Sequence, residues 1–156
     1  MRALPFAFVA ALGLLALPAF SGCEQTTLRP PGVLLTPQHI DPPVGMRARA
    51  VVAFAESQLG RPYCWGGTGP SCFDCSGLTQ RAWGQVGVKL PRTADAIAAT
   101  LPEVAAGDVQ PGDILWWPGH VGIYAGQGWS VEALNARSGV IMRRAFGAKR
   151  AFRPRT

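Results

Sequence analysis

The stretch Phe73-Asp74-Cys75-Ser76-Gly77 decides how the rest of this chain is interpreted. It follows a loop rich in Gly and Pro and opens a run through Trp83 with a helical pattern. Cys75 is therefore predicted to lie at a helix N-terminus, where free backbone N–H groups and the helix dipole favour an anion. A cysteine acts as a nucleophile as its thiolate, so this position suits a reactive thiol.

A histidine and a carboxylate follow later in the chain. His120 lies in Gly119-His120-Val121-Gly122-Ile123-Tyr124, and Glu132 follows it. His120 can take the thiol proton of Cys75, and Glu132 can orient the imidazole, which predicts a catalytic triad. Asn135 is the alternative to Glu132 as the orienting residue.

The hairpin between these two residues tests the triad by strand geometry. Gly126-Gln127-Gly128 predicts a three-residue hairpin loop that places Gly122 opposite Glu132. His120 shares a face with Gly122, because alternate residues of a strand point the same way, so Glu132 becomes its diagonal neighbour. A two-residue turn would instead move Glu132 to the opposite face.

Periodicity along the chain separates helices from strands. Helical spacing predicts helices over Met46–Leu59, Cys75–Val86 and Ala94–Thr100. After the turn signal at Gln110-Pro111-Gly112-Asp113, strands are predicted over Ile114–Trp117, His120–Ala125, Trp129–Ala133 and Val140–Arg144, with a last strand within Phe146–Phe152. Helices first and an antiparallel meander after them predict an α+β fold.

The N-terminus has the pattern of an export signal. Residues 1–22 combine an early arginine with a short apolar run, as in a signal peptide. Phe20-Ser21-Gly22-Cys23 resembles a lipobox, which would make Cys23 the lipidated first residue of the mature protein. Ordinary cleavage near Ala19 or Ser21 is the alternative. In both cases we expect export to the cell envelope, by membrane anchoring or by secretion.

The remainder divides into a linker and one domain. Residues 23–45 are rich in proline and predict a semi-extended linker, and 46–156 form one catalytic domain, expected to be a monomer. The net charge is +6, with a basic C-terminal tail over residues 143–155. No nucleic-acid recognition module accompanies this charge, so attraction to an anionic cell envelope explains it better than nucleic-acid binding; a solvated basic end is the simpler alternative.

Export to an oxidising compartment allows roles to be predicted for the other three cysteines, Cys64, Cys72 and Cys75. In an oxidising compartment Cys64 and Cys72 are predicted to form a disulfide, with Cys75 left as a free thiol. Two alternatives use the same residues. Cys72-Phe73-Asp74-Cys75 has the spacing of a redox motif but no strand of a βαβ unit before it. A zinc site would need a fourth ligand, and His39 lies in the linker.

Short motifs recur along the chain in a definite order. They are Pro62-Tyr63-Cys64-Trp65-Gly66-Gly67, Asp74-Cys75-Ser76-Gly77-Leu78, Leu90-Pro91-Arg92, Pro111-Gly112-Asp113-Ile114-Leu115 and His120-Val121-Gly122-Ile123-Tyr124. Together they resemble the NlpC/P60 family of papain-like cysteine peptidases of bacterial cell walls, over residues 46–145. The resemblance implies a papain-like fold, in agreement with the α+β pattern.

The resemblance also implies roles for residues around the nucleophile. Tyr63 is expected to line the oxyanion site. For Trp65 two interpretations stay open: a wall for the substrate, or packing of its own loop. Asp74 and Ser76 are expected to contact a peptidoglycan stem peptide, and Arg92 matches a motif of the substrate site. Asp74 is also a suitable N-cap for the helix that begins at Cys75.

The implied reaction is hydrolysis of a peptidoglycan stem peptide between γ-D-glutamate and the diamino acid, meso-diaminopimelate or lysine. The thiol chemistry calls for no metal or cofactor. Two other hypotheses stay open. One is a papain-like amidase or acyltransferase that acts on another envelope amide with the same residues. The other is a non-catalytic lipoprotein that binds the envelope.

Overall fold

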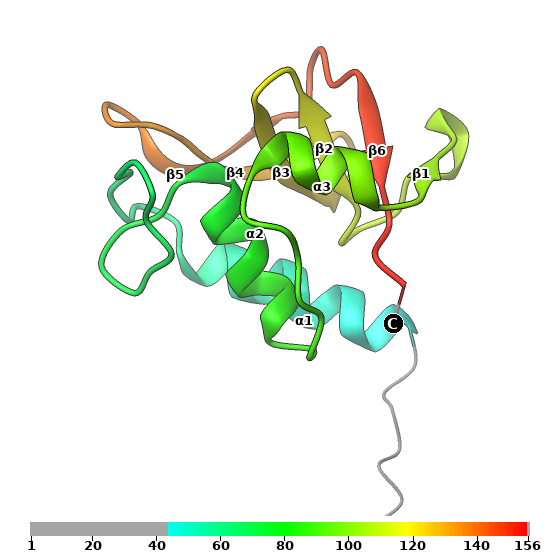
Figure 1. Ribbon diagram of the computed structural model, residues 1–156, viewed down its shortest axis with the longest axis horizontal. Helices are drawn as coiled ribbons and strands as arrows, with labels where there is room; N and C mark the ends of the chain where they lie inside the picture. Colours follow the sequence, from blue (N-terminus) through cyan, green and yellow to red (C-terminus); the bar gives the residue numbers. More distant parts are fainter. Residues whose placement is uncertain (1–43, 156) are drawn as a thin grey trace, which may run out of the picture. The chain divides into compact units, whose positions relative to one another are not determined.

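A computed structural model describes residues 44–155 of the chain. The predicted signal peptide, Cys23 and almost all of the predicted linker lie outside these residues. The described part consists of helices packed on a single antiparallel sheet (Figure 1). Within residues 44–155, no helix has the length and apolar character needed to cross a membrane.

The three predicted helices are present, and two of them have shifted ends. α1 spans Val44–Ser57, so it begins inside the segment that we expected to be linker. α2 spans Cys75–Gly84 and ends before Val86, and α3 spans Ala94–Thr100 as predicted. Side-chain caps explain where α2 and α3 begin. Asp74 accepts a hydrogen bond from the backbone N–H of Gly77, and Thr93 accepts one from that of Ala96.

The sheet contains the predicted meander together with strands at its other edge. The strands are β1 (Glu103–Val104), β2 (Ile114–Trp117), β3 (His120–Gly126), β4 (Trp129–Asn135), β5 (Gly139–Arg144) and β6 (Arg150–Phe152), in the order β1-β6-β2-β3-β4-β5. The last strand therefore lies beside β2 instead of extending the meander beyond β5. β1 and the 3₁₀ helix Ala106–Asp108 were not predicted, because elements this short carry no periodicity.

The helices bury one face of this sheet. Figure 1 shows α1 and α2 together on one side of it. Their apolar side chains form one core with alternate residues of the central strands, which are Val121 and Ile123 of β3 and Val131 and Ala133 of β4. Because side chains alternate between faces, the intervening residues of β3 and β4 point to the opposite face. His120, Gly122 and Glu132 are on that face.

The hairpin between β3 and β4 corrects one prediction and confirms its consequence. Gly126 pairs with Trp129, so the connection is a two-residue turn in which Gln127 (φ 52°) and Gly128 (φ 79°) are left-handed. The register then shifts at Ala125, and Tyr124 pairs with Ser130 as the three-residue loop had predicted. This bulge adds the residue that the turn lacks, and Glu132 returns to the predicted face.

Candidate active site

Asp74 organises the start of α2. Its carboxylate accepts hydrogen bonds from the backbone N–H groups of Gly77 at 2.6 Å and Gly66 at 2.9 Å. The Arg92 guanidinium donates to both carboxylate oxygens, and Ser76 Oγ, 3.2 Å from Asp74 Oδ1, accepts from Arg92 at 2.8 Å. The hydrogen bonds from Arg92 and Gly77 keep the pKa of Asp74 below its usual value, although burial acts in the opposite direction.

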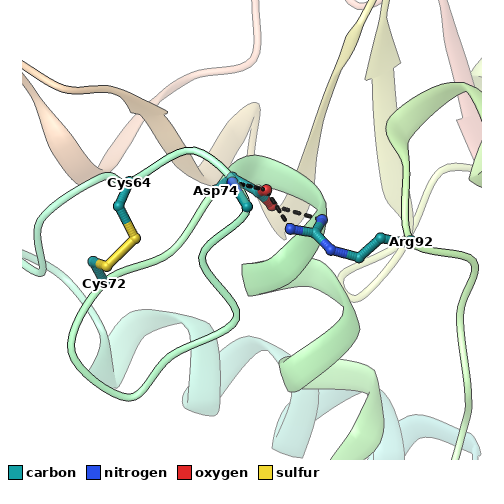
Figure 2. The surroundings of a disulfide bond; sticks show 5 residues. Cys64, Cys72, Asp74 and Arg92 are labelled. Carbon is teal, nitrogen blue, oxygen red and sulfur yellow. Dashed lines mark hydrogen bonds and ion pairs between the residues drawn. A yellow bond between two sulfur atoms is a disulfide. The ribbon is translucent and has the colours of Figure 1, made fainter.

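A disulfide closes the loop that leads into this helix. Cys64 and Cys72 are bonded, with their Cα atoms 5.6 Å apart, and Cys75 keeps a free thiol. The predicted pairing is confirmed, and the redox interpretation of Cys72 with Cys75 is wrong for this structure. Figure 2 shows the disulfide in the loop beside the Asp74–Arg92 pair. Among residues 44–155, no group of three or more His, Cys, Asp or Glu side chains could hold a metal ion.

The Cys75 thiol meets the His120 imidazole. Burial raises the pKa of Cys75, but hydrogen bonds to His120 and to the backbone of Val121 outweigh it, so the pKa lies below its ordinary value. Burial likewise opposes the charged form of His120, yet Cys75 and Glu132 raise the pKa of His120 to about 9. The lowered pKa of Cys75 and the raised pKa of His120 both favour a thiolate beside an imidazolium, and the thiolate is the nucleophilic form of a cysteine.

Glu132 holds the other side of the imidazole. His120 Nε2 lies 2.9 Å from Glu132 Oε2, which leaves Nδ1 for Cys75. The Glu132 side chain has no exposed surface, yet Ser130 Oγ donates to it at 2.6 Å and Arg143 Nε at 3.1 Å. Burial raises the pKa of Glu132. The hydrogen bonds with His120, Ser130 and Arg143 outweigh this effect, so the pKa lies below its usual value.

Asn135, the alternative orienting residue, is engaged elsewhere. Its side-chain oxygen accepts the backbone N–H groups of Arg137 and Ser138, both at 3.0 Å, in the turn between β4 and β5. The side chain that hydrogen-bonds to the His120 imidazole from β4 is that of Glu132. The structure thus brings together Cys75, His120 and Glu132.

A cleft of about 580 Å³ opens over these residues. Tyr63, Trp65, Asp74, Ser76 and Arg92 all line it, together with Cys75 and His120. Trp65 is 92% exposed, so it contributes little to the packing of its loop. Burial and the neighbouring Cys75 and Asp74 raise the pKa of Tyr63, so its hydroxyl stays protonated and can donate a hydrogen bond.

Two contacts of the site were missed from the sequence. The sequence pattern predicts no role for Ser130, and it places Arg143 in the basic C-terminal tail. Both reach Glu132 because β4 and β5 pair with Ser130 opposite Arg143, which puts the two side chains on the Glu132 face. One of these contacts could have been found from the sequence. Ser130 and Glu132 are two residues apart in a predicted strand, so their side chains point to the same face.

Comparison with known proteins identifies the family of the fold and site. The NlpC/P60 family matches residues 60–151. The chain belongs to the NlpC/P60 family. The match includes Cys75, His120 and Glu132, and it begins after the end of α1.

Proteins of known sequence support this assignment. A probable endopeptidase of Corynebacterium glutamicum is 48% identical over 97 residues, which are 60% of this chain and 46% of that protein. A probable endopeptidase p60 of Listeria seeligeri is 43% identical over 88 residues, covering 53% of this chain and 17% of that protein. The chain thus spans less than half the length of these curated relatives.

Solved structures agree with the fold. The NlpC/P60 domain of the peptidoglycan hydrolase SagA superposes with a TM-score of 0.64 at 31% identity, covering 69% of this chain and 98% of that one. The peptidoglycan hydrolase RipB of Mycobacterium tuberculosis gives a TM-score of 0.63 at 32% identity, covering 70% of this chain and 65% of that one. This NlpC/P60 chain therefore has the fold of known peptidoglycan hydrolase domains.

Proposed function

We propose that this NlpC/P60 protein is an exported cysteine peptidase that hydrolyses peptidoglycan stem peptides with Cys75, His120 and Glu132. One observation carries the proposal. Cys75 lies at the N-terminus of α2 against His120, whose Nε2 is 2.9 Å from the buried Glu132 carboxylate. The nucleophile is thus hydrogen-bonded to the base, and the base is hydrogen-bonded to the orienting carboxylate.

Acylation follows from this arrangement. The Cys75 thiolate attacks the carbonyl carbon of the scissile amide, and the carbonyl oxygen becomes an oxyanion. The backbone N–H of Cys75 and the Tyr63 hydroxyl are the proposed donors to that oxyanion. His120 carries a proton at neutral pH, because its pKa is raised to about 9. It passes this proton to the amine nitrogen as the C–N bond breaks, which leaves a thioester on Cys75.

Deacylation reverses the roles. His120, now neutral, takes a proton from a water molecule that attacks the thioester carbonyl, and the acid product leaves as the Cys75 thiolate is restored. Glu132 keeps the ring oriented throughout and stabilises the imidazolium at the beginning and end of the cycle.

The relatives and the cleft support a stem-peptide substrate. SagA and RipB are both described as peptidoglycan hydrolases. We propose that the scissile bond is the amide between γ-D-glutamate and the diamino acid, which is meso-diaminopimelate or lysine. Arg92 presents its guanidinium to the cleft while it holds Asp74 and Ser76, and Trp65 supplies an exposed apolar wall.

The proposed location is the cell envelope. The Cys64–Cys72 disulfide fits an oxidising compartment, which agrees with the predicted signal peptide. Lipidation of Cys23 would anchor the protein to the membrane beside its substrate. Mass spectrometry of the N-terminal peptide from membrane fractions tests this, and a mature protein that begins elsewhere without lipid would show free secretion.

Digestion of purified peptidoglycan tests the reaction. Mass spectrometry of the products is expected to show cleavage between γ-D-glutamate and the diamino acid by the wild type, and none by Cys75→Ala. The variant should unfold at the wild-type temperature within error, since only a partly buried thiol is lost. Cleavage by Cys75→Ala, or release of a different amide product by the wild type, would refute the proposed reaction.

A further inference from the structure

We propose that Arg143 is a positioning residue that keeps Glu132 ionised, both beside the imidazolium of the resting enzyme and while His120 passes through its neutral state. This inference rests on the proposed function, because the neutral state arises in the catalytic cycle. It concerns a residue that the sequence places in the basic tail and that the structure places behind the site.

The first step is the charge balance around Glu132. Within residues 44–155, the charged or titratable groups bonded to its carboxylate are His120 from β3 and Arg143 from β5. Ser130 also donates to it but is neutral. When His120 gives its proton to the leaving amine, Arg143 is therefore the cation that remains.

The second step concerns the ionisation of the Glu132 carboxylate when no cation lies beside it. Glu132 has no exposed surface, and a buried carboxylate without a cation takes up a proton at a higher pH. A protonated Glu132 could donate to the Nε2 of His120 and stabilise the wrong tautomer. With Arg143 in place, Glu132 stays an acceptor, so the proton stays on Nε2 and Nδ1 keeps its lone pair toward Cys75.

The third step is the geometry that holds Arg143. Its Nε lies 3.1 Å from both oxygens of Glu132, and its Cζ lies 5.7 Å from the centre of the Trp117 ring. The Trp117 ring is itself 5.6 Å from the His120 ring, and its Nε1 donates to the carbonyl of Phe146 at 3.0 Å. Arg143, Trp117, His120 and Glu132 thus form a closed set of contacts. The Arg143 side chain is 39% exposed, so part of its charge stays hydrated.

The neighbouring residue provides a matched control. Arg144 points to the opposite face of β5, where its guanidinium lies 4.5 Å from the Trp129 ring centre and donates to the carbonyl of Gln127 at 3.0 Å. Arg144→Met removes the same charge from the next position without touching Glu132.

The experiment measures alkylation of Cys75 by iodoacetamide as a function of pH. In Arg143→Met we expect the acid limb of the profile to move to higher pH, because Glu132 is protonated sooner and no longer supports the imidazolium. The alkylation rate on the acid side of neutrality should fall about tenfold, the order expected for one charge-assisted hydrogen bond. Arg143→Lys should recover part of the shift, and Arg144→Met should show none.

A double-mutant cycle keeps the inference falsifiable if Arg143→Met is destabilised. With Glu132→Gln already present, Arg143→Lys should cause no further change in the alkylation profile, because Arg143 acts through the carboxylate. An unchanged acid limb in folded Arg143→Met, a shift equal to that of Arg144→Met, or additive effects in the cycle would overturn the proposal. Alkylation needs no peptidoglycan, so failure to cleave stem peptides would refute the proposed function separately.

Discussion

Gly122 leaves the space that Glu132 occupies. A Cβ built on Gly122 would lie 2.5 Å from Glu132 Cγ, closer than two carbon atoms can approach. Gly122 is on β3 and Glu132 on β4, and both are on the His120 face of the sheet. The missing side chain therefore lets the carboxylate of Glu132 cross the neighbouring strand and reach the imidazole.

We expect Gly122→Ala to lower both stability and activity. The added methyl group must push Glu132 or the strand aside, an overpacking that costs about 1–3 kcal/mol. Gly84→Ala is the control, since a Cβ on this last residue of α2 meets nothing within 4 Å. Urea unfolding and cleavage of stem peptides measure the two effects. Wild-type activity in Gly122→Ala would mean that the position of Glu132 is not needed.

Glu132 and His120 are expected to differ in their effect on the rate. His120 moves the proton, so His120→Ala should reduce cleavage by about 10²–10⁴-fold. Glu132→Gln keeps the shape of the side chain but removes the charge that supports the imidazolium, so we expect a smaller loss of about tenfold. Single-turnover cleavage rates compare them. Equal rates for the two variants, or an unaffected Glu132→Gln, would remove Glu132 from the triad.

The site was predictable to the extent that it depends on local pattern. Asp74 and the helix that follows it are encoded by capping and periodicity within a few residues. The face of Glu132 was predicted correctly from a turn of the wrong length, because the bulge at Ala125 compensates for the two-residue turn at Gln127-Gly128.

Other features depend on long-range pairing. Arg143 meets Glu132 only because β5 pairs with β4 in one register, and β6 returns to β2 rather than to β5. Arg153 holds the buried Asp113 from the far end of the chain in the same way, at 2.7 Å from Nε to Oδ1. The charge pattern of a sequence does not reveal the register in which strands pair. A solvated basic tail and a set of arginines in structural ion pairs therefore look the same in the sequence.

The reactivity of Cys75 should follow a window of pH. The pKa of Cys75 is lowered, so the thiolate appears below the pH at which an ordinary thiol ionises. The pKa of His120 is raised to about 9, so the imidazolium is fully present below its ordinary value of 6.5 and is lost as the pH rises through about 9. Cleavage should therefore show a plateau that ends on the alkaline side near pH 9. Stopped reactions over a pH series measure it. A fall in activity near pH 6.5 would mean that His120 titrates without its partners.

Removal of the disulfide should cost stability and leave the thiol chemistry in place. Cys64 and Cys72 lie 8 positions apart in the sequence, and closing so short a loop is worth about 2–3 kcal/mol in the chain-entropy model. The double variant Cys64→Ser with Cys72→Ser should therefore unfold at a lower urea concentration than the wild type. The loop keeps hydrogen bonds from Gly66 N–H to Asp74 at 2.9 Å and from Asp74 N–H to the Gly67 carbonyl at 2.9 Å, so the start of α2 should hold its position.

The rate of Cys75 alkylation measures this second part and is expected to stay within about twofold of the wild type, because the cap and His120 are unchanged. The single variant Cys64→Ser is the informative comparison, since it leaves the Cys72 thiol close in sequence to Cys75. Peptide mapping without reductant should then reveal whether the two thiols pair. A double variant as stable as the wild type would show that the disulfide adds nothing to the fold. Loss of Cys75 alkylation in a folded double variant would show that the disulfide positions the nucleophile itself.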